Sequence, residues 1–127
     1  MNTWLLGASA LLVVTAVVHS AMGERRIFLP WCSILPRDVL RHHQVILRVT
    51  WHLPSLLGMG QAATLAVLAT ANAASAWRLP LGLLAMSVGA CGVLVAVATR
   101  GRHQGGEALL AAGGLIAVGL PWQGEGP

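Results

Sequence analysis

Four long apolar segments, separated by short polar stretches, dominate the sequence. They cover roughly residues 3–22, 44–71, 79–99 and 107–122. A helix needs about 20 apolar residues to cross about 30 Å of hydrocarbon, and the first three segments meet that length. The last spans only about 24 Å at about 1.5 Å per residue, so it must stand nearly upright or lie where the bilayer is thin. The pattern predicts an all-α integral membrane bundle of four transmembrane helices, with residues 1–127 forming a single domain.

Composition supports the membrane assignment. Hydrophobic residues make up 56% of the 127 positions and charged residues only 9%. This leaves too little polar surface to cover a water-soluble globule of this length. The sequence has no cysteine pair with zinc-site spacing, no phosphate-binding glycine loop and no nucleophile elbow. We therefore expect no catalytic residues of the kinds found in soluble enzymes.

Positive charge is concentrated in two of the three connections between the predicted helices. All 8 basic residues are arginine. The first and third connections and their edges hold Arg25, Arg26, Arg37, Arg41, Arg48, Arg100 and Arg102, whereas the middle connection holds Arg78 alone. Loops rich in Lys and Arg face the cytoplasm, so we expect both termini outside, in a bacterial inner membrane. Orientation in the membrane then explains the net positive charge without a nucleic-acid partner, and membrane lipids are the expected counterions.

The first connection mixes apolar and polar positions over about 20 residues. Phe28 and Trp31 suit the headgroup layer, while Pro30 and Pro36 argue against a continuous helix. We therefore expect a long interfacial loop between the first and second helices.

Small residues recur four positions apart in the third and fourth segments. The pairs are Ala85 with Gly89, Gly92 with Ala96, and Gly113 with Ala117. In lipid such pairs let helix backbones approach closely. The spacing favours packing inside the bundle, and contact with another protein remains open.

Ionisable side chains gather in the half of the bundle predicted to face the cytoplasm. An ionisable residue inside a membrane is costly and therefore indicates a functional site. The candidate metal ligands are His19, Glu24, His42, His43, His52 and His103. Imidazole and carboxylate groups on facing helices suit a transition metal, and His19 with His52 would also suit axial binding of a haem. Against this reading, neither His-x-x-x-His nor Glu-x-x-His occurs within one helix.

The same residues also allow a purely structural interpretation. Arg48 lies about 6 Å inside the predicted second helix and needs a partner there. Glu24 is a suitable partner if Gly23 ends the first helix and lets the chain turn back. An ion pair between Glu24 and Arg48, with hydrogen-bonded histidines, would fix the loop to the bundle without any chemistry.

The second helix carries a polar stripe. At about 100° per residue, Arg41, Arg48 and His52 fall close together, with Gln44 and Ser55 beside them and Met59 continuing the line. We expect this stripe to face protein. Pro54 removes a backbone donor and predicts a kink beside His52.

The stretches "HSAMGERR" and "WHLPSLLGMG" resemble a group of uncharacterised four-helix bacterial inner-membrane proteins. These pair a His-Ser-x-x-Gly-Glu-Arg motif at the end of helix one with a Trp-His early in helix two. The resemblance implies one linked feature formed by His19, Ser20, Gly23, Glu24, Arg25, Trp51 and His52. It implies no activity.

We expect an accessory or interaction subunit of a larger membrane assembly, in contact with lipids and with other subunits or copies of itself. A membrane-embedded metal or haem protein is the alternative, and proton or solute transport by an oligomer is a third. Transport is disfavoured because the outer half of every predicted helix lacks ionisable groups, which leaves no path across one chain.

Overall fold

The computed structural model describes residues 1–34, 37–70 and 77–120, without the side chains of residues 32–34 and 37–42. These ranges are helical and contain no strand. The elements are α1 (Thr3–Gly23), η1 (Glu24–Phe28), α2 (Leu29–Ile34), α3 (Arg37–Thr70), α4 (Arg78–Ala98) and α5 (Gln104–Val118). The predicted all-α class is confirmed.

Three helices are long and apolar enough to cross a membrane. They lie within Thr3–Trp31, His43–Thr70 and Arg78–Ala98. The fourth predicted span is also an apolar helix, but α5 begins and ends earlier than expected and has only 15 residues. It measures about 22 Å, which is short of the hydrocarbon thickness.

The expected long interfacial loop is wrong, because the chain is helical on both sides of residues 35–36. The helix begun by α1 continues through η1, a π-helical turn in which the N–H of Leu29 donates to the carbonyl of Glu24, five residues back. Pro30 then lies in the first turn of α2, where a missing N–H is tolerated. The π turn thus lets the rod pass a proline that would break an ordinary α-helix.

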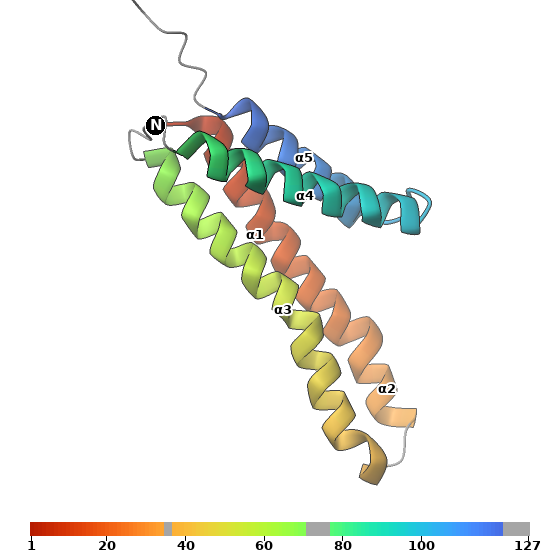
Figure 1. The fold of residues 1–127 in the computed structure, drawn as a ribbon. Helices are drawn as coiled ribbons and strands as arrows, with labels where there is room; N and C mark the ends of the chain where they lie inside the picture. The colour runs from red at the N-terminus through yellow and green to blue at the C-terminus, as the bar shows by residue number, and fades with distance from the viewer. Residues whose placement is uncertain (35–36, 71–76, 121–127) are drawn as a thin grey trace, which may run out of the picture.

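The described helices lie in a row in the order α3, α1, α5, α4. α1 and α3 form one antiparallel hairpin and α4 and α5 a second (Figure 1). Among the described elements, α3 approaches only α1 and η1 within 8 Å between Cα atoms, and α4 approaches only α5. α1 and α5 join the two hairpins. The arrangement is therefore more open than the predicted bundle, in which every helix would have two neighbours.

The two hairpins meet at the end that holds the N-terminus and diverge toward the other end (Figure 1). Asn2 fastens the meeting point. Its Oδ1 caps α1 by accepting from the N–H groups of Trp4 and Leu5. Its Nδ2 donates to the carbonyl of Gly119 at 2.7 Å, and its backbone N–H to that of Ala69 at 2.8 Å. One residue thereby ties the start of α1 to the ends of α3 and α5.

Small residues bring α4 and α5 together. A Cβ on Gly92 would lie 2.8 Å from the backbone nitrogen of Leu110, and one on Gly113 would lie 3.0 Å from the carbonyl oxygen of Ala85. The predicted internal use of this spacing is confirmed at these positions, because only glycine leaves room for such close backbones.

Candidate functional site

The antiparallel register of α1 and α3 decides which polar residues meet. Ser9 donates to the carbonyl of Ala62 at 2.8 Å, and a Cβ on Gly58 would lie 3.9 Å from that of Ala16. Moving away from the N-terminus along α1 therefore means moving backward along α3. The end of α1 and the turn η1 consequently lie opposite residues 48–55 of α3.

Glu24 and Arg48 form an ion pair across this interface. Arg48 Nη2 lies 2.9 Å from Glu24 Oε1, and both side chains are 37% exposed. The arginine Cζ also lies 5.7 Å from the centre of the Phe28 ring, which is within the range of a cation–π contact. The structure thus brings together the two charges that the sequence paired, although by a different route. Gly23 does not end the helix, since its φ of −59° and ψ of −48° are right-handed helical.

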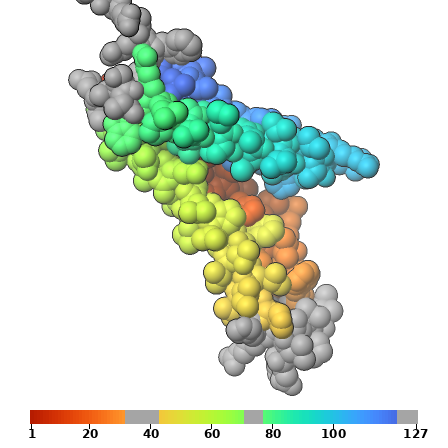
Figure 2. Space-filling model, viewed as in Figure 1, coloured from red at the N-terminus to blue at the C-terminus, as the bar shows by residue number. Residues whose placement is uncertain are grey.

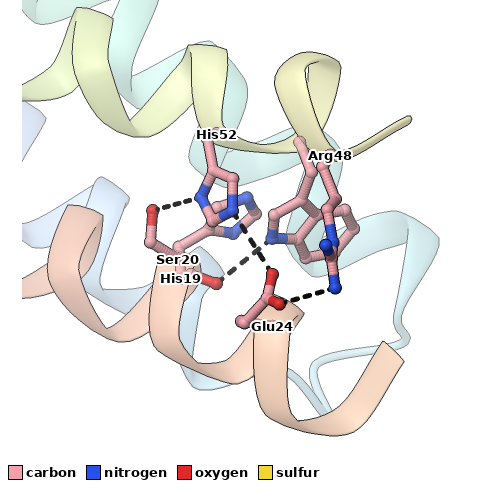
Figure 3. A network of polar contacts seen from close by, with 6 residues as sticks. His19, Ser20, Glu24, Arg48 and His52 are labelled. Atoms are coloured by element: carbon pink, nitrogen blue, oxygen red, sulfur yellow. Dashed lines mark hydrogen bonds and ion pairs between the residues drawn. The ribbon is translucent and has the colours of Figure 1, made fainter. Parts of the chain in front are cut away.

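His52 joins the same network from α3 (Figure 3). Its Nδ1 lies 2.9 Å from the hydroxyl oxygen of Ser20, and its Nε2 lies 3.7 Å from Glu24 Oε2. With the proton on Nε2, the ring directs its N–H toward the carboxylate and accepts the hydrogen bond from Ser20. We call Ser20, Glu24, Arg48 and His52 the polar network.

A serine, a histidine and a carboxylate in line are also the parts of a nucleophilic triad. Acyl transfer further requires hydrogen-bond donors placed for the developing oxyanion. Ser20 lies inside the continuous helix Thr3–Gly23, where backbone N–H groups are taken up by the helix itself. The geometry therefore supports a hydrogen-bonded lock between α1 and α3 better than a hydrolase site.

Trp51 packs beside the polar network. Its indole N–H donates to the carbonyl of His19 at 3.2 Å, and its ring stacks on the His19 imidazole with centroids 4.5 Å apart. Phe28 meets the same indole edge-on at 6.2 Å. A Cβ on Gly23 would overlap the indole, so the absence of a side chain at position 23 lets Trp51 pack directly against α1. The contact joins α1, η1 and α3 at one level.

Most residues of the linked feature that the resemblance implies lie together in the structure. Arg25 is the exception, because its side chain is exposed on the surface. Sequence reasoning from the residues alone missed Phe28, which is only 4% exposed. The signal was present in the spacing, because Ser20, Glu24 and Phe28 follow one another at intervals of four and share a helix face.

The predicted stripe on α3 faces protein only in part. Arg48 and His52 turn toward α1, and Ser55 is buried, but Met59 is 45% exposed and the prediction is wrong there. The buried line instead continues from Ser55 through Ala62 to Ala69 at intervals of seven, the repeat that keeps a seam against a neighbouring helix. Pro54 lies within unbroken α3, which bends part-way along its length (Figure 1).

The remaining predicted ligands are dispersed. His43 is exposed on α3, while His103 is exposed on the other hairpin and accepts the N–H of Gly105 at 3.1 Å. The side chain of His42 lies outside the described residues. In the described part of the chain, no three His, Cys, Asp or Glu side chains are grouped to hold a metal ion. A metal or haem on His19 and His52 stays a prediction.

Comparison with known proteins gives no assignment: no protein family, curated protein or solved structure matches the chain. The chemistry of the site is therefore inferred from its own residues.

Proposed function

We propose that this chain is a bacterial inner-membrane protein that acts as an accessory subunit of a larger membrane assembly. Both termini lie outside, and the arginines of η1 and of the start of α3, with those of the α4–α5 turn, face the cytoplasm. The subunit binds its partner through the side of α3 that points away from α1.

The observation that carries this proposal is the place of α3 at the edge of the row. α3 is the least apolar of the three candidate spans, yet α1 is the only long helix beside it among the described elements. A span surrounded by lipid on most sides is expected to be the most apolar, since lipid offers polar groups no partner. A protein surface against α3 would resolve this conflict.

The uncovered side of α3 has the composition of a helix-packing face. At about 100° per residue, Leu53, Leu57, Gly60 and Thr64 form a stripe opposite the buried positions. Leu53 and Leu57 are 49% and 61% exposed, and Gly60 has open space where a Cβ would lie. The Thr64 hydroxyl bonds back to the Gly60 carbonyl at 3.0 Å, which leaves a smooth surface for another helix. We call these four residues the α3 outer stripe.

The polar network supports the same role. Its charges pair with each other instead of pointing into a channel. Paired in this way, they hold α3 at a fixed rotation against α1 and so present the α3 outer stripe in one orientation.

The test is site-specific photo-crosslinking in intact cells, with a benzophenone amino acid in place of Leu57. Leu94 on α4, which is 68% exposed, supplies the matched control. We expect a discrete adduct of higher mass from position 57, none from position 94, and loss of the adduct when Gly60→Leu fills the stripe. An adduct containing only two copies of this chain, or equal labelling at both positions, would overturn the accessory role.

A metal or haem protein remains the alternative, and a separate measurement decides it. Elemental analysis and absorbance of the purified chain would then show a stoichiometric metal or a haem band. That band or metal would have to disappear in both His19→Ala and His52→Ala. Failure of either substitution to remove it would place the cofactor elsewhere.

A further inference from the structure

α5 covers one side of α1 only near the end where the hairpins meet. A Cβ on Gly7 would lie 3.7 Å from Leu115 of α5, which marks the covered side. Val14 and Val18 lie within about 20° of Gly7 around the helix, yet are 58% and 50% exposed. Figure 2 shows an opening between this part of α1 and the α4–α5 hairpin. We call the opening the wedge.

The mouth of the wedge is basic. The α4–α5 turn carries Arg100, Arg102 and His103, all exposed. Two acidic side chains lie nearby: Glu24 is held by Arg48 on the α3 side, and Glu107 is exposed in the first turn of α5. The two arginines outweigh the single carboxylate on their own hairpin.

The backbone of the turn limits which variants can test the site. Arg100 has a φ of 53°, in the left-handed region where Gly and Asn are favoured. It follows the end of α4, where the N–H of Gly101 donates to the carbonyl of Ala96 at 2.7 Å and closes the helix. A substitution at position 100 must therefore suit this backbone.

The depth of the turn matches a headgroup. α4 has 21 residues and rises from the meeting end of the hairpins to the turn. At about 1.5 Å per residue it measures about 31 Å, the thickness of the hydrocarbon core. If the meeting end lies at one membrane surface, the arginines of the turn lie in the headgroup layer of the other.

We propose that the wedge binds one anionic phospholipid, with an acyl chain along Val14 and Val18 and its phosphate among Arg100, Arg102 and His103. The apolar wall supplies burial for the chain, and guanidinium groups are suited to phosphate oxygens. A free phosphate ion could bind the basic residues of the turn, but it would not contact Val14 and Val18. The proposal rests on the membrane placement proposed above, but not on any partner at the α3 outer stripe.

Native mass spectrometry of the full chain, released from nanodiscs of equal phosphatidylglycerol and phosphatidylcholine, tests the site. We expect one phosphatidylglycerol to be retained in preference to phosphatidylcholine. The double variant Arg100→Asn with Arg102→Gln should lower that retention at least fivefold, and asparagine suits the left-handed backbone of position 100. The control is Arg25→Gln with Arg26→Gln, which removes the same charge from exposed positions on the other hairpin and should leave retention unchanged.

A second pair of variants tests the apolar wall. Val18→Trp should fill the wedge and lower retention, whereas Val17→Trp, on another side of α1 and 54% exposed, should not. Thermal melting in detergent checks that all variants fold. Equal loss from both arginine pairs, equal retention of the two lipids, or displacement by millimolar inorganic phosphate would overturn the proposal. So would an unchanged lipid count in folded Val18→Trp.

Discussion

The imidazole of His19 lies parallel to the indole of Trp51, with centroids 4.5 Å apart and planes within 6°. The indole also donates to the His19 backbone, and it fits against α1 because residue 23 has no side chain. Stacking, hydrogen bond and close approach all act at one level of the α1–α3 hairpin. This contact determines how near the two helices come at the polar network.

Gly23→Ala should therefore destabilise the protein. The new methyl group would overlap the indole and force it out of its stack, at a cost of about 1–3 kcal/mol for an overpacked site. Thermal or denaturant unfolding in detergent measures the change. Gly114→Ala is the matched control, because nothing lies near its Cβ position and alanine is the better helix former. Equal stability of the two variants would mean that Trp51 does not occupy this position.

Glu24 and Arg48 should depend on each other. Glu24→Gln leaves the guanidinium without its carboxylate at the edge of the apolar region, whereas Glu24→Gln with Arg48→Met removes both charges. We expect the single variant to be the less stable in detergent. The pair is 37% exposed, so the coupling should be at most about 1 kcal/mol. A double variant that is less stable than the single one would contradict the pairing.

Ser9 should contribute to stability through its bond to the other helix. Its hydroxyl donates to the Ala62 carbonyl in a buried position, so Ser9→Ala should cost about 0.6 kcal/mol, the average for hydrogen bonds between membrane helices. Ser87 provides the control, because its hydroxyl is exposed and donates to the carbonyl of Leu84 on its own helix. Unfolding of Ser87→Ala should match the parent protein. A similar loss from both variants would mean that the bond to Ala62 is not the cause, because alanine is the better helix former at both positions.

Reporter fusions test the orientation. Alkaline phosphatase joined to either terminus should be active, and a fluorescent protein joined to either should remain dark, if the arginine-rich regions at the opposite end face the cytoplasm as proposed. A fluorescent C-terminal fusion alone would mean that short α5 does not cross the membrane. Fluorescence at both termini would mean that both termini lie in the cytoplasm, which is the opposite of the proposed orientation.

Local sequence pattern predicted the helices well, because apolar length and helix formation depend on neighbouring residues. It also predicted the partner of Arg48, since a charge in an apolar segment needs a counter-charge nearby. It failed between residues 23 and 34. Gly23 and Pro30 are helix breakers by local rules, but here Gly23 makes room for Trp51, and the π turn accommodates Pro30.

The open row was not predictable from the same pattern. Which side of a helix faces its neighbour depends on close contacts such as that of Gly92 with Leu110, and these join residues far apart in the sequence. The spacing of small residues favoured close packing inside the bundle, but it did not identify which helices pair. It gave no indication that α3 and α4 would stay apart.

If the protein spans a bilayer as proposed, the unequal lengths of the two hairpins have a consequence for the surrounding lipid. From Thr3 to Ile34 the first rod measures about 48 Å, against about 31 Å for α4, and both start from the end fastened by Asn2. A flat membrane cannot match both legs at once. One possibility is that the Thr3–Ile34 rod tilts in the membrane. The other is that its arginine-bearing end projects beyond the membrane surface, while the bilayer becomes thinner around α4. Every copy would then impose an asymmetric local thinning on the membrane, and copies would collect where lipid is already thin or curved.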